Sequence, residues 1–378
     1  MRHKYQVVTF LAVALSLVLV LPAINVFDSI SHREQQKHTL MQAALHTMTE
    51  ERLFSTDGVQ GMARYQAWQQ LGRSLDEGQV VAGRDGYLFL GNDFNSVVDK
   101  STGRFPVSTE TVERWASGLA DLKHWYESQQ IPFAIAVAPN KHTVYPEKLP
   151  SHHSRAGKTV TDLLLDAAAS HGTPIYDMRA PLLMAKRDLP LYYRTDTHWN
   201  RRAAGLAYQG FLTFSGEQTG FALTPASIDL VPGVTGAGDL TRLLKVERFL
   251  PAGLEDDPRY QHGPHQACVG ELDLANGRVG PCELSDRPVA QLTEAGQYVK
   301  SDHALNTQRV LWLGDSFTNA QTELVARTFS TVWFVHWVYV QPEALARFVR
   351  AVKPDLVLYQ VIERDLLHDK LIEPLPDS

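Results

Sequence analysis

Asp196 and His198 stand two positions apart in the stretch YYRTDTHWN, residues 192–200, and could form the acid–imidazole pair of a catalytic triad. Side chains at positions i and i+2 of an extended backbone project to the same side. The Asp196 carboxylate can then accept a hydrogen bond from one ring nitrogen of His198 and leave the other nitrogen as a base. Two alternatives stay open. Asp196 or Thr197 could cap a helix that begins near Asn200, or the pair could ligate a metal, although no further ligands follow at convincing spacing.

Ser316 is the candidate nucleophile, because the motif GDS (314–316) lies between the apolar run VLWL and the stretch TNAQTELVARTF, which predicts a helix. A serine at a strand-to-helix turn exposes its hydroxyl beyond the sheet edge, and its own N–H is among the unpaired donors of the helix N-terminus. Such donors suit a developing oxyanion. The alternative is that Asp315 or Ser316 is an ordinary helix cap.

Together, the GDS and D-x-H motifs resemble those of the SGNH-hydrolase superfamily, in most of which GDS comes before the Asp/His pair. Here the order is reversed, and further strings resemble the alginate O-acetyltransferase AlgJ/AlgX-type family: GRDGYLFL (83–90), APNKHTVYPEKLP (138–150), YYRTDTHWN and VIERDL (361–366). The resemblance runs from about residue 80 to the C-terminus. We expect the AlgJ-type form, because the chain after Arg364 is too short for the extra carbohydrate-binding domain of AlgX-type members.

The resemblance implies that Ser316 takes an acetyl group as an ester and passes it to a sugar hydroxyl, with His198 as general acid and base and Asp196 as its orienting partner. Asn140 is our candidate for the oxyanion hole because it follows the predicted strand FAIAVA, while Lys141 and Tyr145 match the family string. Turn formation for Asn140, and surface or packing roles for Lys141 and Tyr145, are the alternatives.

Three further residues are candidates for substrate binding. Asp315 precedes the nucleophile directly. Arg194 and Arg364 could bind an anionic polysaccharide, or could instead hold Asp196 and Glu363 in ion pairs.

The elements that must position these residues alternate between short apolar strands and helices, which predicts a parallel sheet flanked by helices, as in SGNH hydrolases. Predicted strands and helices follow one another from residue 109 to residue 214 and again from residue 308 to the C-terminus. A turn in GRDG predicts a hairpin between Val80–Val81 and Tyr87–Leu90. Residues 216–300 break the alternation and predict a loop-rich insertion or small β subdomain.

The N-terminal segment predicts export from the cytoplasm. Arg2 and Lys4 precede the apolar run from Val7 to Val26, which is about long enough to cross a bilayer. We expect residues 1–27 to be an uncleaved signal-anchor, with a cleaved signal peptide as the alternative. Residues 28–79 would then form a helical stalk or linker, and residues 80–378 the SGNH-like domain. In an oxidising compartment Cys268 and Cys282, the two cysteines of the chain, are expected to form a disulfide.

Composition excludes several other functions. The formal net charge of −6 argues against a nucleic-acid-binding protein. The absence of zinc-type Cys/His spacing, a Walker-type loop and G-x-G-x-x-G means that we expect no metal and no cofactor.

The resemblance therefore predicts a periplasmic O-acetyltransferase of an exopolysaccharide, tethered to the bacterial inner membrane. Its expected partners are the polysaccharide acceptor, a multi-pass membrane acyltransferase as acetyl donor, and other polysaccharide synthesis and export proteins. A carbohydrate acetylesterase with the same triad is the alternative. A non-catalytic polysaccharide-binding subunit of an export complex is disfavoured, because a scaffold needs none of the three triad residues.

Overall fold

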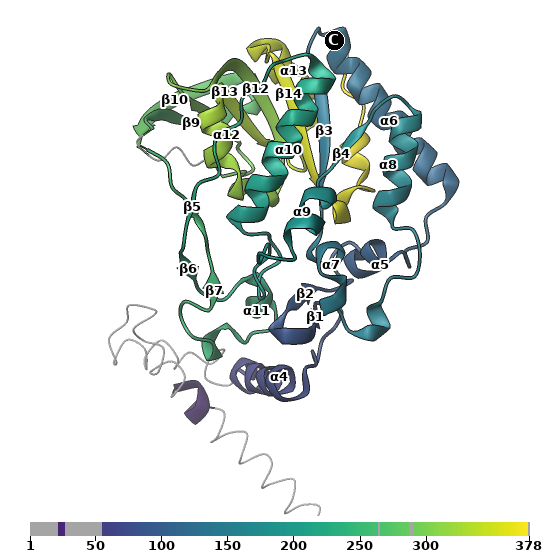
Figure 1. Ribbon diagram of the computed structural model, residues 1–378, viewed down its shortest axis with the longest axis vertical. Helices are drawn as coiled ribbons and strands as arrows, with labels where there is room; N and C mark the ends of the chain where they lie inside the picture. Colours follow the sequence, from purple (N-terminus) through teal and green to yellow (C-terminus); the bar gives the residue numbers. More distant parts are fainter. Residues whose placement is uncertain (1–21, 27–54, 264, 287–290, 377–378) are drawn as a thin grey trace, which may run out of the picture.

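A central eight-stranded sheet organises the protein in the computed structural model, which describes residues 22–26, 55–263, 265–286 and 291–376 (Figure 1). The strand order is β10-β9-β11-β13-β12-β14-β3-β4. Its strands are β3 (Phe133–Ala138), β4 (Ile175–Asp177), β9 (Ala267–Asp273), β10 (Arg278–Ser285), β11 (Gln297–Lys300), β12 (Asn306–Gly314), β13 (Phe329–His336) and β14 (Leu356–Ile362).

The expectation of a parallel sheet is correct for only part of this sheet. Strands β13, β12, β14, β3 and β4 pair in parallel, whereas β11 pairs antiparallel with both β13 and β9, and β10 pairs antiparallel with β9. The antiparallel strands come from the end of the segment predicted as an insertion. They extend the main sheet, which is therefore mixed.

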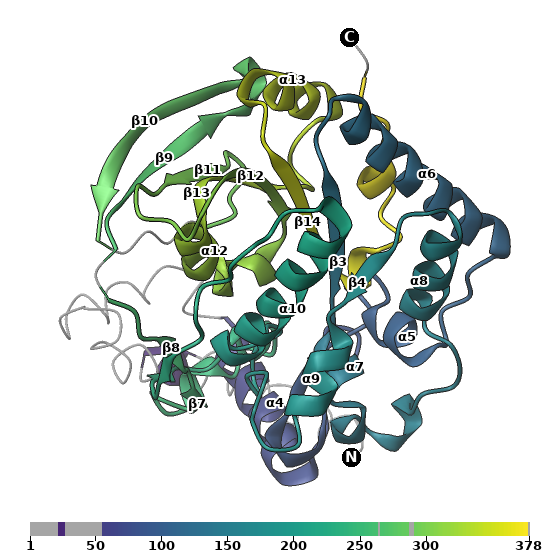
Figure 2. The same cartoon turned by 45° about the horizontal axis from the view of Figure 1, so that its top comes forward.

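Helices cover both faces of the sheet, and the strands supply alternate residues to two cores. On β3, Ala134 and Ala136 face one core while Phe133 and Ile135 face the other. The first core includes residues of α9 (Arg179–Ala185), α10 (Arg201–Thr219) and α12 (Thr322–Thr328). The second includes residues of α6 (Thr109–Ser128), α8 (Val160–Ser170) and α13 (Pro342–Val352). Figure 2 shows α10 against one face of the sheet, with α6 and α8 beyond β4.

The predicted hairpin is present as β1 (Val80–Ala82) and β2 (Leu88–Leu90), which pair antiparallel. Both strands are buried. Helices α4 (Asp57–Leu71), α5 (Val97–Thr102) and α7 (Lys141–Val144) lie before the hairpin, after it and after β3, respectively.

Residues 216–300 contribute two small sheets before they reach the main one. Strand β5 (Leu230–Val231) pairs with β8 (Arg259–Tyr260), and β6 (Val234–Thr235) pairs with β7 (Glu255–Asp256). A short helix, α11 (Asp239–Leu243), lies between β6 and β7 in sequence. The predicted disulfide is present: Cys268 and Cys282 are bonded across β9 and β10, with their Cα atoms 5.4 Å apart.

The helix predicted after GDS is broken into two pieces. A 3₁₀ turn over Ser316–Ala320 precedes α12. The other 3₁₀ turns in the described part of the chain are Arg84–Gly86, Pro146–Lys148, Ser151–His153, Glu247–Phe249, Leu274–Asn276, Glu363–Asp365 and Asp369–Ile372.

The predicted membrane anchor at residues 1–27 lies outside the described residues, except for positions 22–26. Among the helices that the structure describes, none combines the length and apolarity needed to cross a bilayer. Most of the predicted stalk is likewise outside the described part of the chain, and α4 is its described helix.

Candidate active site

The loop that carries Asp196 and His198 is not a helix cap. The cap of α10 is Asn200, whose side-chain oxygen accepts hydrogen bonds from the N–H groups of Arg202 (3.0 Å) and Ala203 (3.2 Å). Because Asn200 already satisfies these helix donors, the capping alternative for Asp196 and Thr197 is wrong. Their side chains are free to serve the loop itself.

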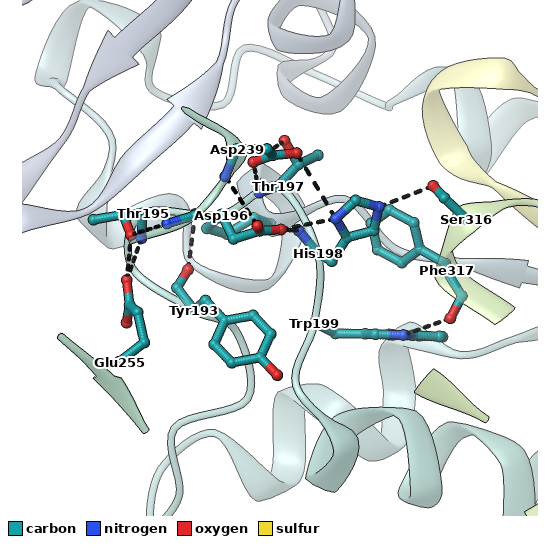
Figure 3. Close-up of polar contacts among 12 residues, drawn as sticks. Tyr193, Thr195, Asp196, Thr197, His198, Trp199, Asp239, Glu255, Ser316 and Phe317 are labelled. Atoms are coloured by element: carbon teal, nitrogen blue, oxygen red, sulfur yellow. Dashed lines mark hydrogen bonds and ion pairs between the residues drawn. The ribbon is translucent and has the colours of Figure 1, made fainter. Parts of the chain in front are cut away.

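Ser316, His198 and Asp196 form a continuous chain of hydrogen bonds (Figure 3). Nδ1 of His198 lies 2.7 Å from Oδ1 of Asp196, and Nε2 lies 2.9 Å from Oγ of Ser316. Since Nδ1 faces a carboxylate, it carries the proton, and Nε2 accepts a hydrogen bond from the Ser316 hydroxyl. This is the tautomer in which an imidazole can act as a base toward a serine.

Asp196 is held as a carboxylate. Its Oδ1 also accepts the N–H of His198 (2.9 Å), and its Oδ2 accepts the N–H of Asp239 (3.0 Å). Burial alone would raise the pKa of Asp196, but the hydrogen bonds and charge of His198, together with the Asp239 N–H, lower it to about 2. The acid that orients His198 therefore stays ionised at neutral pH.

Asp239 is a part of the site that sequence reasoning missed. It is the first residue of α11, and its Oδ1 accepts the N–H (2.7 Å) and hydroxyl (3.1 Å) of Thr197. Its Oδ2 lies 3.8 Å from Nδ1 of His198. The preceding residue must be glycine, because a Cβ on Gly238 would lie 2.6 Å from the backbone nitrogen of Asp196. No local pattern in YYRTDTHWN indicates this partner.

Residues 216–300, the segment predicted as an insertion, also supply a buried carboxylate that binds the backbone of the loop with Asp196 and His198. Glu255 of β7 is buried, and its carboxylate accepts the N–H groups of Arg194 (3.0 Å) and Thr195 (2.7 Å). It also accepts the hydroxyl of Thr195 (2.6 Å), whose oxygen in turn accepts the N–H of Gly238 (3.0 Å). Residues 216–300 therefore help to position the acid–imidazole pair.

Trp199 joins the loop that carries Asp196 and His198 (residues 192–200, the histidine loop) to the 3₁₀ turn Ser316–Ala320 (the serine turn). Its indole N–H donates to the carbonyl of Phe317 at 2.9 Å, and the rings of the two residues lie 5.2 Å apart. The Phe317 ring also lies 4.9 Å from the imidazole of His198. Both aromatic side chains are buried, so the residues next to His198 and Ser316 are fixed against each other.

The serine turn is in addition tied to the end of a neighbouring strand. Asp315 is buried, and its two carboxylate oxygens accept the N–H groups of Phe317 (2.9 Å) and of Ile362 at the end of β14 (2.8 Å). Burial raises the pKa of Asp315 to about 6. Asp315 thus shapes the turn, and we do not assign it to substrate binding.

A cleft of about 480 Å³ opens over the triad. Ser316, His198 and Asp196 all line it, together with Tyr193, Arg201, Thr235, Gly236, Ala237, Gly238, Arg242, Glu255, Asp257, Gln291, Trp199, Phe317, Asn319 and Ala320. Most of the lining residues have polar or charged side chains, although aromatic rings also contribute surface, and this mixture suits a sugar substrate.

Asn140, Lys141 and Tyr145 do not line this cleft. The N–H of Asn140 donates to Glu363 (2.6 Å), and its side-chain amide donates to Ser101 (3.1 Å). The Tyr145 hydroxyl accepts the N–H of Leu191 (3.0 Å). The prediction that Asn140 faces the oxyanion is corrected by these contacts, because its amide is buried and used elsewhere.

Lys141 is buried and joins two segments. Its ammonium donates to the carbonyls of Leu88 (2.6 Å), Tyr193 (2.9 Å) and Arg194 (3.1 Å). Burial lowers its pKa to about 8, although the carboxylates of the site oppose the shift. Lys141 thus fixes the start of the histidine loop to the hairpin and does not reach the substrate cleft.

Arg194 and Arg364 do not form the ion pairs with Asp196 and Glu363 that were the alternative to substrate binding. Arg194 lies 3.8 Å from Glu255, not against Asp196, and is about half exposed. Arg364 lies 4.0 Å from Asp365 and 5.6 Å above the Phe317 ring, while Glu363 lies 4.0 Å from Arg179. Neither Arg194 nor Arg364 lines the cleft over the triad.

Asn319 is a second residue that sequence reasoning missed. Side chains at positions i and i+3 of a 3₁₀ turn lie on the same side of the turn. Asn319 is therefore on the same side of its turn as Ser316. Its Oδ1 accepts the N–H of Leu292 at 3.0 Å, so its amide nitrogen is the group left for the cleft, which Asn319 lines. Asn319 follows Ser316 by three positions, and this spacing would have indicated the donor if a 3₁₀ turn had been predicted there.

Asp196, His198 and Asp239 also have the residue types of a metal site. However, two ligands of one tetrahedral zinc ion lie about 3.3 Å apart when each is about 2.0 Å from the metal. The 2.7 Å between His198 and Asp196 is instead a hydrogen-bond distance. A second group, Glu77, His152 and His153, lies outside the cleft.

Comparison with known proteins finds a matching family and similar folds. Residues 80–267 match the family described as SGNH hydrolase-like domain, acetyltransferase AlgX. The matched segment contains Asp196 and His198 and ends before Ser316. The probable alginate O-acetylase AlgJ of Pseudomonas aeruginosa is 28% identical over 123 residues, which are 32% of this chain. The chain aligns with 29% of that relative's length.

Solved structures share the fold. Bacillus cereus PatB1 has a TM-score of 0.57 at 17% identity, over 77% of this chain and 98% of that chain. A DHHW family protein from Eubacterium siraeum has a TM-score of 0.54 at 14% identity, over 80% of this chain and 97% of that chain. At these identities the similarity shows the fold alone.

Proposed function

The chain belongs to the AlgJ/AlgX-type family of SGNH hydrolase-like acetyltransferases, and from this premise we propose that it transfers acetyl groups to hydroxyls of an exopolysaccharide similar to alginate. The observation that carries the proposal is the hydrogen-bonded chain from Ser316 through His198 to Asp196 at the base of a polar cleft. A nucleophile, a base and an orienting acid in this arrangement are what acyl transfer through a serine ester requires.

In the first half of the reaction, Ser316 attacks the carbonyl carbon of an acetyl ester while its hydroxyl proton passes to Nε2 of His198. The tetrahedral intermediate then collapses, and His198 returns the proton to the leaving alcohol. Asp196 stabilises the imidazolium that exists between these two steps. The product is acetyl-Ser316.

In the second half, His198 removes the proton from a sugar hydroxyl, and the resulting oxygen nucleophile attacks the ester carbonyl of acetyl-Ser316. Collapse returns the proton to the Ser316 oxygen and leaves an acetylated sugar. The backbone N–H of Ser316, at the start of its turn, and the side-chain amide of Asn319 are the donors that we assign to the oxyanion in both halves.

The test is acetylation of the purified full-length chain by an activated acetyl ester such as 4-nitrophenyl acetate, followed by mass spectrometry of the Ser316 peptide. We expect one acetyl group on Ser316, which Ser316→Ala removes. Ser154→Ala is the matched control, because Ser154 is exposed and does not line the cleft. An unlabelled Ser316 in the wild-type chain would contradict the proposal.

A second step separates transfer from hydrolysis. Uronic acid oligosaccharides are added to the acetylated chain, and sugar products and free acetate are quantified. Acetylated oligosaccharide supports the transferase. Release of acetate alone would identify an acetylesterase instead, because water would then be the acceptor.

We also propose a periplasmic location, with residues 1–27 as an inner-membrane anchor. The disulfide between Cys268 and Cys282 supports an oxidising compartment. Fractionation of cells that express a tagged full-length chain should place it in the inner membrane and accessible to protease from the periplasmic side. Recovery in the cytoplasm would contradict this location.

The acetyl donor is proposed to be supplied by a multi-pass membrane acyltransferase that works with other proteins of polysaccharide synthesis and export. The open polar cleft over Ser316 supports delivery of the acetyl group by a partner. Cross-linking of the full-length chain in membranes should capture such a protein, and an unchanged level of Ser316 acetylation in cells that lack it would refute the assignment.

A further inference from the structure

A second hollow, of about 880 Å³, adjoins the cleft over the triad. The two share Arg201 and Asp257 in their linings, so one wall separates them. The second hollow is bounded by β5, β8, the chain that leads to β9, and α12. In Figure 1, β5 and α12 lie on the same side of α10, the helix that begins beside the triad. In Figure 2, β8 and α12 also lie on one side of α10.

The second hollow is rigidly linked to the serine turn. The hydroxyl of Tyr260, in β8, donates toward the carbonyl of Arg201 (2.8 Å) and that of Ala320 (3.0 Å). Arg201 starts α10, directly after the histidine loop, and Ala320 ends the turn that starts at Ser316. The distance from the second hollow to the triad is therefore set by the same contacts that hold the turn.

The carboxylates of the second hollow are already occupied. Asp257 accepts from Arg201 (2.7 Å) and from the hydroxyl of Tyr193 (2.7 Å). Asp286 accepts from Gln266 (3.0 Å), and Glu323 lies 3.9 Å from Arg327. Arginines therefore balance the charges of Asp257 and Glu323, whereas Asp286 is bonded to a neutral amide.

Among the arginines that line the second hollow, Arg259 has the most exposed side chain. Its side chain is 63% exposed and lies 3.7 Å from Asp257, a carboxylate that already has two closer partners. A planar guanidinium with free donors suits a carboxylate of a ligand, which it can bind through two parallel hydrogen bonds. Gln261 and Gln266, both exposed, add amide groups that suit sugar hydroxyls.

We propose that the second hollow is an acceptor subsite, which holds acidic sugar units next to the unit that receives the acetyl group, with Arg259 binding a sugar carboxylate. The inference rests on the proposed function, because it places the acceptor chain across both hollows. A polymer is favoured over a small ligand, since the second hollow is larger than the catalytic cleft and shares its wall. Arg259 would select acidic polymers and set their register, and it takes no part in the chemistry.

The experiment measures acetyl transfer by the full-length chain to uronic acid oligomers of increasing length, with neutral glucan oligomers of equal length for comparison. For wild-type protein the KM for uronic acid oligomers should fall as length increases. Arg259→Ala should raise the KM for long acidic oligomers about tenfold, as expected for loss of one charge-assisted contact, with kcat unchanged. Arg259→Lys should recover part of the loss, because it keeps the charge but not the fork.

Two controls protect the interpretation. Arg278→Ala removes an exposed arginine on β10, away from both hollows, and should leave every KM unchanged. Acetylation of Ser316 without acceptor should proceed at the wild-type rate in Arg259→Ala, which shows that the variant is folded and that its chemistry is intact. An unchanged KM for long acidic oligomers in that variant would overturn the subsite.

Direct binding keeps the test independent of the chemistry. Calorimetric titration of the Ser316→Ala chain with uronic acid oligomers needs no acetyl donor, so it remains informative even if Ser316 is never acetylated. Binding that Arg259→Ala weakens about tenfold supports the subsite. Equal binding of acidic and neutral oligomers, or equal binding by Arg259→Ala, would overturn it.

Discussion

His198 is held by contacts on three sides, and each has a separate chemical effect. Asp196 accepts from Nδ1, Ser316 donates to Nε2, and the Phe317 ring lies 4.9 Å away. The carboxylate determines which nitrogen carries the proton, while the aromatic ring limits rotation of the imidazole. The result is an imidazole whose Nε2 faces one hydroxyl.

Asp239 offers a test of how much the second carboxylate contributes. Asp239→Asn should lower the rate of Ser316 acetylation about tenfold, because a charge-assisted hydrogen bond worth about 1.4 kcal/mol is weakened at Thr197, next to the triad. The rate is measured with an activated acetyl ester. Asp229→Asn, at an exposed position, is the control and should leave the rate unchanged. A wild-type rate in Asp239→Asn would show that Asp196 alone orients the histidine.

Asn319 tests the assignment of the oxyanion hole. Asn319→Ala should lower the rate of Ser316 acetylation by about a hundredfold, because removal of one oxyanion donor typically has an effect of this size. Asn276→Ala serves as the control, since that exposed side chain bonds to Asp273 outside the cleft. Thermal unfolding of both variants should stay close to wild type. A loss below about threefold would remove Asn319 from the oxyanion hole.

At the scale of elements, the site depends on how two loops are tied to their neighbours. The histidine loop is held from one side by Lys141 and from the other by Glu255. The serine turn is held by Asp315 to β14 and by Trp199 to the histidine loop. These are buried polar contacts, which fix position more sharply than apolar packing because each donor has one acceptor.

Lys141 provides a stability prediction for this arrangement. Lys141→Met should lower the free energy of unfolding by about 2 kcal/mol, because one buried and two partly buried carbonyls lose their donor while the cost of burying an ammonium is removed. Denaturant titration measures the change. Lys158→Met, which breaks an exposed pair with Asp166, should leave it unchanged within experimental error. Equal effects of the two substitutions would contradict the role assigned to Lys141.

Asp315 predicts a pH dependence of stability. Its folded pKa, about 6, lies above its usual value of 3.8, so the folded state binds more protons than the unfolded state between these values. The stability that Asp315 contributes is therefore present below about pH 3.8 and is lost as the pH rises through 6. From pH 4 to pH 7 the stability of Asp315→Asn should improve relative to wild type by on the order of 3 kcal/mol. Denaturant titrations at both pH values measure this, and a constant difference would contradict the raised pKa.

At the scale of the whole molecule, the sheet separates the site from a region that stabilises the fold. Ser316 follows β12, whereas the disulfide joins β9 and β10, with β11 and β13 between them in the sheet. The catalytic contacts should therefore survive changes at the outer strands.

The disulfide makes this separation testable. Replacing both Cys268 and Cys282 by serine should lower the free energy of unfolding by up to about 3 kcal/mol, the value for a closed loop of this length. The rate of Ser316 acetylation should remain within about twofold of wild type at 25 °C. Loss of acetylation in a variant that still unfolds cooperatively would show that the outer strands reach the site.

Local patterns were sufficient for much of the fold and for the centre of the site. The strands and helices follow from apolar periodicity, and the hairpin follows from its turn residues. Asp196 and His198 interact as their spacing predicts, because two residues of one loop need no distant contact to meet. The motif GDS likewise predicted a serine at the end of a strand, because the strand and the turn that hold Ser316 are adjacent in sequence.

What only the tertiary structure decided is which distant segments complete the site. Asp239 and Glu255 come from a segment whose sequence lacks periodicity, and β9–β11 of the same segment join the main sheet. Asn140 and Lys141 follow a strand as ligand-binding residues do, yet their polar groups are consumed by buried partners. Local sequence determines backbone conformation, but the satisfaction of each buried donor and acceptor depends on chain segments far away in sequence, and this selected Asn319 and Asp239 as neighbours of the triad.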